Sequence, residues 1–112
     1  MAWSVTGIAV AAFPPGSMRE VRLGDTSVLL VRISEAVRAV TSICPHEGGI
    51  LADGALSGSR VVCPVHGATF DALTGRVLAD PDGIEPPQGG VEPLSVYATR
   101  IVGGMIEVQL PE

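Results

Sequence analysis

The chain has 112 residues, a formal net charge of −5 and 46% hydrophobic residues, which is enough for one domain with a modest core. All seven basic residues are arginines and they form no basic stripe, so nucleic acid is a poor candidate partner. The longest apolar run near the start, IAVAAF, is too short for a signal sequence or a membrane span. We therefore expect a cytoplasmic protein without a membrane partner, whose thiols stay reduced.

Strand-like patterns dominate both ends of the chain. Apolar residues recur there at alternate or continuous positions, with the turn-forming stretches FPPGS and LGDTS between the first runs. The runs are residues 5–10, 18–23, 27–33, 36–43, 93–102 and 105–110. Gly103 and Gly104 between the last two runs predict a two-residue hairpin turn. No segment keeps a helical period over ten residues, so the pattern predicts an all-β domain, an antiparallel sandwich or small barrel.

Ten apolar residues of these runs are expected in the core. They are Trp3, Val5, Ile8, Val28, Leu30, Val40, Ile43, Val96, Ile101 and Val108.

The middle of the chain, from Cys44 to about Gly90, is dense in glycine and proline and holds only short apolar pieces. We expect a loop-rich insertion on the β scaffold, the kind of segment that commonly carries a site. Asp71 and Thr74 are expected to shape a tight turn before Gly75 through side-chain hydrogen bonds to the backbone. Residues 81–93, PDGIEPPQGGVEP, hold four of the nine prolines and predict a stiff loop.

Both cysteines and both histidines of the chain fall into two short loops, each with a proline after the cysteine. The pattern is Cys44-x-His46, sixteen residues, then Cys63-x-x-His66. Ordinary core positions, a disulfide or a Cys–His nucleophile pair would each leave part of this pattern unexplained. A structural zinc site is the serious alternative, because two Cys and two His form a tetrahedral set.

Each loop, however, mixes one thiolate with one imidazole. A single ion does not require that mixing, whereas two ions of different character do. The pattern therefore favours a [2Fe–2S] cluster with both thiolates on one iron and both imidazoles on the other. Gly48, Gly49 and Gly67 would let the backbone approach closely and point amide N–H groups at the cluster sulfurs. Pro45 and Pro64 would restrict the two loops.

The stretches CPHEGGIL, CPVHGATFDALTG and VEPLSVY resemble the signature of the Rieske family, C-x-H, C-P-x-H-G and F-D-x-x-T-G. The similarity to the small Rieske ferredoxins covers nearly the whole chain. It implies a single Rieske domain over residues 1–112, a β sandwich with a cluster-binding subdomain at about 44–80 and a proline-rich cover loop at about 81–93. It also implies one cluster per chain, with Cys44, His46, Cys63 and His66 as its ligands.

Departures from the family pattern indicate which branch the chain resembles. Gly49 and Val65 stand where high-potential Rieske proteins carry two further cysteines, so that disulfide is impossible here. Ala68 and Phe70 stand where those proteins place a serine and a tyrosine that donate to the cluster sulfurs. Fewer donors disfavour the added electron, so we expect a potential toward the lower end of the Rieske range of roughly −150 to +300 mV. For Phe70 we expect core packing.

The sequence contains no mononuclear iron motif and no nucleotide-binding glycine fingerprint. The resemblance therefore implies an electron-transfer protein, not an enzyme by itself, that passes one electron at a time from a flavin reductase to a terminal oxygenase. The histidine edge is expected to be exposed and to dock both partners transiently. The alternatives are a permanently bound Rieske subunit of a reductase such as nitrite reductase, a zinc-held binding module, and an iron–sulfur sensor.

Overall fold

The computed structural model describes residues 2–45 and 48–111. These residues form strands and short 3-10 helices, and no α-helix is found among them. The strands are β1 (Ala2–Ala9), β2 (Met18–Leu23), β3 (Thr26–Ile33), β4 (Ala36–Thr41), β5 (Ala55–Ser57), β6 (Arg60–Val62), β7 (Thr69–Asp71), β8 (Val77–Ala79), β9 (Val96–Tyr97), β10 (Thr99–Val102) and β11 (Met105–Leu110). The 3-10 helices are η1 (Val10–Ala12), η2 (Leu51–Asp53) and η3 (Pro81–Gly83). None of the helices in this described part is long and apolar enough to cross a membrane.

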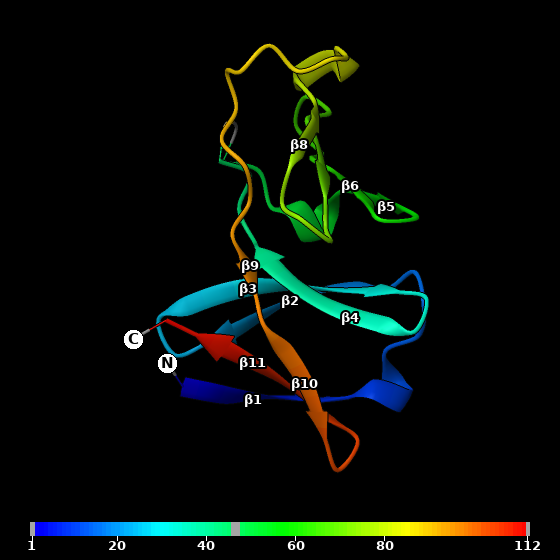
Figure 1. Cartoon of the computed structure of the whole chain (residues 1–112), viewed down its shortest axis with the longest axis vertical. Helices are drawn as coiled ribbons and strands as arrows, with labels where there is room; N and C mark the ends of the chain where they lie inside the picture. The colour runs from blue at the N-terminus through cyan, green and yellow to red at the C-terminus, as the bar shows by residue number, and fades with distance from the viewer. Residues whose placement is uncertain (1, 46–47, 112) are drawn as a thin grey trace.

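Three antiparallel sheets build the molecule, with strand orders β1-β11-β10, β2-β3-β4-β9 and β5-β6-β7-β8. The sheet around β3 lies between the other two, with the β1-β11-β10 sheet at one end of the long axis and the β5–β8 sheet at the other (Figure 1). The all-β, antiparallel fold class is therefore confirmed. The sequence-based division into a subdomain at 44–80 and a cover loop at 81–93 stays a prediction.

Strand β3 is buried on both faces. Val28 and Leu30 belong to one apolar cluster with Ile106 and Val108 of β11. Leu29 and Val31 point the other way, into a second apolar cluster that contains Cys44, Cys63 and Phe70. This double burial explains why SVLLVRI is continuously apolar where most antiparallel strands alternate. It also means that one strand supports both the sandwich and the loops that carry the cysteines.

The predicted strands at both ends are confirmed, with one division that the sequence did not indicate. Residues 93–102 form two strands, β9 and β10, which pair with β4 and β11 respectively, so that the chain changes sheets at Ala98. Gly103 and Gly104 form the predicted tight turn, with φ of 57° and 78°. The middle segment, expected to be mainly loop, instead contains four strands of three residues each. Strands that short show no alternation from which they could be predicted.

The expected core is wrong at five of its ten positions, one of which is Trp3, which is only partly buried and has Arg100 stacked over its ring. Val5, Ile43, Val96 and Ile101 are between 42% and 61% exposed. Val5 pairs with Glu107, whose neighbours Ile106 and Val108 face the core, so Val5 lies on the outer face. Val96 and Ile101 belong to β9 and β10, which are edge strands of their sheets and are covered less completely.

The turn after β7 has the predicted construction. The Leu73 amide donates to Asp71 Oδ1 at 2.8 Å and the Arg76 amide donates to Thr74 Oγ1 at 3.2 Å. Gly75 lies at the end of this turn with φ of +79°, and its carbonyl accepts a 2.8 Å bond from the amide of Leu94. A Cβ atom at Gly75 would lie 2.2 Å from the carbonyl oxygen of Leu94. Only glycine at position 75 therefore allows the backbone of Leu94 to pack against this turn.

Replacing Gly75 by alanine is expected to destabilise the protein by about 3 kcal/mol. About 1–2 kcal/mol comes from the left-handed backbone and the rest from displacing a packed carbonyl. Gly24→Ala is the matched control, because Gly24 has φ of +65° but open space around its missing Cβ. Urea unfolding should show a loss of only about 1–2 kcal/mol for that variant. Equal losses for the two variants would contradict the packing argument.

Candidate metal centre

The first cysteine loop lies between Ile43 and Ile50, which face each other in an isolated antiparallel bridge. The amide of Cys44 donates to the carbonyl oxygen of Gly49 at 2.8 Å, and the amide of Gly48 donates back to the carbonyl of Cys44 at 2.9 Å. Two backbone hydrogen bonds thus close a six-residue loop that begins at the cysteine.

The second cysteine loop has the same closure. It lies between Val62 of β6 and Thr69 of β7, which face each other in the ladder. The amide of Cys63 donates to the carbonyl oxygen of Ala68 at 2.8 Å, and the amide of Gly67 donates to the carbonyl of Cys63 at 3.1 Å. The two loops therefore share the same pair of closing backbone hydrogen bonds.

The fifth residue of each loop is a glycine with positive φ, 70° at Gly48 and 78° at Gly67. This conformation lets each amide turn back onto the carbonyl of the preceding cysteine. These two amides therefore donate to carbonyl oxygens, whereas amides of Val65 and His66 donate toward the sulfur of Cys63. The role of the Gly48 and Gly67 amides is to close the loops.

Gly49 has the other expected role, close approach. A Cβ atom at this position would lie 2.6 Å from Val65 Cγ2 and 3.0 Å from Cys63 Sγ. The backbone of the first loop thus passes directly against the second loop and its sulfur. As long as valine occupies position 65, a side chain at position 49 would push the two cysteine loops apart.

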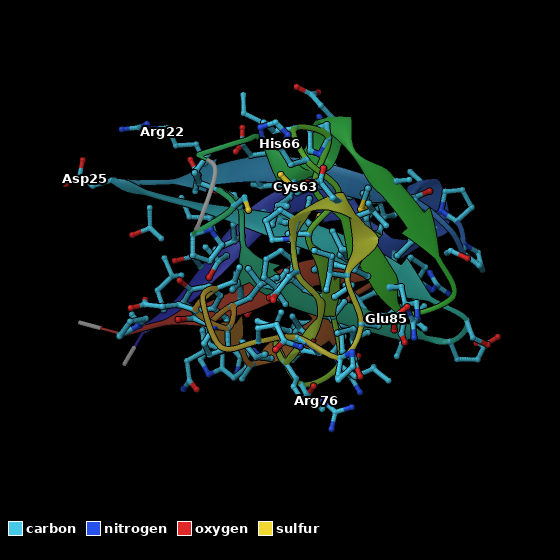
Figure 2. The ribbon with its side chains drawn as sticks, turned by 90° about the horizontal axis from the view of Figure 1, so that it is seen from above. Arg22, Asp25, Cys63, His66, Arg76 and Glu85 are labelled. Carbon is cyan, nitrogen blue, oxygen red and sulfur yellow. The ribbon has the colours of Figure 1, made fainter. Side chains whose placement is uncertain are left out.

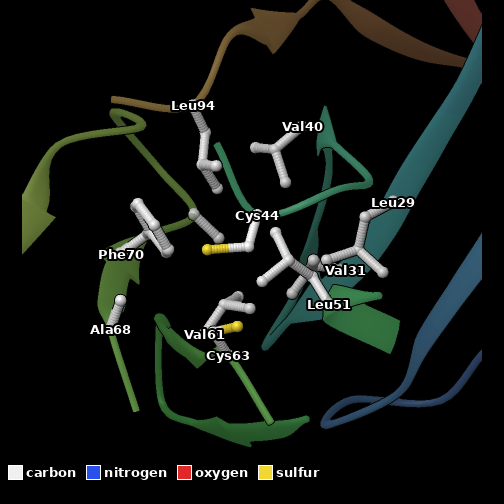
Figure 3. Close-up of a cluster of buried hydrophobic side chains, with 11 residues drawn as sticks. Leu29, Val31, Val40, Cys44, Leu51, Val61, Cys63, Ala68, Phe70 and Leu94 are labelled. Atoms are coloured by element: carbon white, nitrogen blue, oxygen red, sulfur yellow. The ribbon is translucent and has the colours of Figure 1, made fainter. Parts of the chain in front are cut away.

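The thiols of Cys44 and Cys63 are free and both are buried, each only 1% exposed. They lie in the apolar cluster that also holds Leu51, Val61 and Phe70, between the β3 sheet and the β5–β8 sheet (Figure 3). Core packing of Phe70 is thereby confirmed. The cysteines are part of the hydrophobic core and, at the same time, the first residues of two turning loops.

The surroundings of Cys63 determine how easily the two buried thiols lose their protons. Burial raises the pKa of the Cys63 thiol, and the adjacent Cys44 raises it further through a hydrogen bond and through charge repulsion. The backbone amides of Val65 and His66 lower this pKa by donating toward the sulfur. Two adjacent buried thiolates are stable only with positive charge beside them, and a metal supplies it. Amide donors already aimed at the sulfur fit a thiolate ligand.

His66 lies at the exposed edge of the second loop, three residues after Cys63 (Figure 2). Its carbonyl oxygen accepts a hydrogen bond from the amide of Asp82 in η3. His46 and Glu47 lie outside the described residues. Within that described part, no three Cys, His, Asp or Glu side chains are grouped to hold one metal ion. A two-iron cluster does not need such a group, because each iron takes only two protein ligands.

Sequence analysis did not identify the contact of Asp82 with the second loop. The Asp82-Gly83 pair is a turn signal, and Asp82 does adopt φ of +67°. A turn signal says nothing about where the turn docks, and a contact made by backbone atoms leaves no trace in residue type. The docking of this segment could be found only in three dimensions.

Comparison with known proteins adds independent findings on the chain as a whole. A family model described as the Rieske [2Fe-2S] domain matches residues 4–92. The chain is 43% identical over 84 residues to human apoptosis-inducing factor 3, but it spans only 14% of that protein's length. It is 31% identical to the ferredoxin subunit of a 3-phenylpropionate/cinnamic acid dioxygenase from Shigella flexneri, covering 92% of this chain and 90% of that one.

A solved structure of similar shape comes from a complex of reduced oxygenase and oxidized ferredoxin in carbazole 1,9a-dioxygenase. The TM-score is 0.77 and the sequence identity 27%, over 95% of this chain and 91% of the other.

The proximity of the two loops can be tested without any metal. An ideal Cβ at Gly49 lies 3.7 Å from Val65 Cβ, which is within the usual range for a disulfide. The double variant Gly49→Cys/Val65→Cys should therefore form a disulfide in air, stabilising the protein by about 3 kcal/mol for a loop of this length. Mass spectrometry would detect the bond, and urea unfolding with and without reductant would measure the gain. Each single variant is the control, and free thiols in the oxidised double variant would contradict the geometry.

Proposed function

Since the chain belongs to the Rieske [2Fe-2S] family and carries that cluster, we propose that it is a one-electron carrier that supplies a terminal oxygenase. The near full-length similarity to a dioxygenase ferredoxin subunit supports this role. So does the likeness to a structure from an oxygenase–ferredoxin complex. When bound, the cluster accepts and releases one electron per cycle.

We propose that Cys44 and Cys63 bind one iron and that His46 and His66 bind the other. The observation that carries this proposal is the pair of identically closed loops, which bury both thiols together and leave His66 exposed. The chain thereby encloses the thiolate side in its core and presents the imidazole side to solvent. An electron can then enter and leave at the exposed side, over a short path to a docked partner.

The docking surface in this proposal is the exposed edge around His66. Val65, immediately before it, is 47% exposed, and Ile84, just beyond the η3 segment that bonds to the His66 carbonyl, is 52% exposed. Apolar side chains beside an exposed redox group suit a small, transient contact, since they give a partner apolar area to bury. We propose that the oxygenase contacts this edge.

We further propose a flavin reductase as the electron donor and the cytoplasm as the location, where both free thiols would stay reduced until they bind iron. In the same proposal, residues 44–80 form the cluster-binding unit and residues 81–93 cover it.

The midpoint potential should lie below zero, toward the lower end of the Rieske range. Ala68 is fully buried in the second loop and donates nothing. Ala68→Ser should raise the potential by about 40 mV, because one added hydrogen bond of about 1 kcal/mol favours the reduced state. Redox titration followed by visible absorption would measure both values.

Ala72→Ser is the matched control for this shift. Ala72 is equally buried in the same apolar cluster but lies outside the two loops. Its hydroxyl should cost stability and leave the potential unchanged. A wild-type midpoint well above zero would overturn the assignment to the low-potential branch.

Electron delivery should depend on the apolar edge. Stopped-flow mixing of the reduced protein with the terminal oxygenase of the same organism should show rapid reoxidation. Val65→Asp should raise the KM of the oxygenase for the reduced protein about fivefold or more. This is the effect of losing about 1 kcal/mol of contact energy between the two proteins. Val5→Asp is the control, since Val5 is 61% exposed on β1 at the opposite end. No electron transfer from the wild type would refute the proposed function, and equal effects of the two variants would refute the docking surface.

A further inference from the structure

Asp80 organises the loop formed by residues 80–88, which follows β8. Its amide donates to the carbonyl of Ile84 at 2.9 Å, and its own carbonyl accepts from the amide of Gly83 at 3.1 Å. Its carboxylate oxygen Oδ2 accepts a 2.6 Å hydrogen bond from the amide of Gln88. Asp80, the first residue of the loop, is therefore bonded both to the turn at Gly83 and Ile84 and to the last residue, Gln88.

The carboxylate of Asp80 is an unusual choice for this position. The residue is only 9% exposed, and Oδ1 has no hydrogen-bond partner in the part of the chain that the structure describes. Burying a carboxylate is unfavourable unless strong interactions offset the lost hydration. The short bond to Gln88 is of the charge-assisted kind, roughly twice as strong as a bond between neutral groups. The side chain is thus suited to holding the loop firmly, at some cost in stability.

The 80–88 loop contacts the second cysteine loop through a backbone hydrogen bond. Asp82 lies in η3, between Asp80 and its bonding partners Gly83 and Ile84, and its amide donates to the carbonyl oxygen of His66. Asp80 fixes the backbone on either side of Asp82 through its bonds to Gly83, Ile84 and Gln88, and the Asp82 amide then contacts the backbone of His66.

The ion pair that joins this loop to β6 is weak. Arg60 of β6 and Glu85 lie 3.7 Å apart, and both side chains are about half exposed. Exposed ion pairs of this kind contribute little. This pair cannot hold the loop in place of Asp80.

We propose that Asp80 is a positioning residue for the metal centre: by tying residues 80–88 into one shape, it holds Asp82 against the carbonyl of His66 and so fixes the second cysteine loop. This inference rests on the proposed function, because His66 matters here as a cluster ligand. The hydrogen bonds of Asp80 go to Gly83, Ile84 and Gln88 of its own loop, so it acts through the loop.

The test compares Asp80→Asn, Asp80→Ala and Asp82→Asn in the purified holoprotein. Asn at position 80 keeps an acceptor for the Gln88 amide but makes a weaker bond, whereas Ala removes the bond. Asn at position 82 removes the same charge from the same loop and tolerates the positive φ there, while the amide that donates to His66 remains. The readouts are the rate of cluster loss to excess chelator, followed by visible absorption, and the EPR g-values of the reduced protein.

Cluster loss should be about tenfold faster in Asp80→Ala and about threefold faster in Asp80→Asn, with Asp82→Asn like the wild type. The g-values should change in Asp80→Ala and stay fixed in Asp82→Asn. Equal rates in all four proteins would overturn the proposal, and so would equal effects of the two Asn variants, which would indicate charge alone. If Asp80→Ala does not fold, the comparison of the two Asn variants still decides. These results concern only cluster retention, so they are independent of whether the wild type reduces an oxygenase.

Discussion

The burial of two thiols side by side in an apolar core is the constraint on which the rest of the structure depends. Cys44 and Cys63 fill the space between the β3 sheet and the β5–β8 sheet, together with Leu29, Val61 and Phe70. As neutral thiols they pack well, but as thiolates they repel each other in a medium that stabilises charge poorly. With Cys44 and Cys63 as the proposed ligands, iron would resolve this conflict, and cofactor binding would be coupled to the packing of the two sheets. Hydrophobic packing alone therefore does not stabilise the thiolate form of this core.

In the proposed site, the two loops place the cluster at one side of that core. The same pair of backbone hydrogen bonds closes each loop, which begins at a buried cysteine. Gly49 allows the first loop to approach the second until its backbone lies against the sulfur of Cys63. The thiolate end is then inaccessible to solvent, whereas His66 is exposed beside apolar Val65. Such asymmetry suits a carrier, because the electron has one short route in and out and the opposite end can be devoted to stability. The β1-β11-β10 sheet, far from the loops, provides that support (Figure 1).

Sequence patterns predicted the parts of this arrangement that are local. The two CP-containing loops, the hairpin at Gly103 and Gly104, the turn at Asp71 and the long strands all depend on residues close in sequence. Patterns failed where the determinant is tertiary. The three-residue strands β5–β8 exist because they pair with one another, and the exposure of Val5 depends on which face of β1 finds a partner. The tie between Asp80 and the 80–88 loop has no sequence signature, since its partner is the backbone of Gln88. The structure leaves His46 outside its described residues, so its ligand role still rests on the loop pattern.

The central claim is that two histidines and two cysteines share one asymmetric cluster. Pulsed EPR of the reduced protein, prepared with ¹⁵N-labelled histidine in an otherwise unlabelled chain, tests it most directly. The account predicts strong couplings from two histidine nitrogens, with the loss of one of them in a His66→Cys variant. Coupling from one histidine or none, or a protein that contains zinc without acid-labile sulfide, would contradict it.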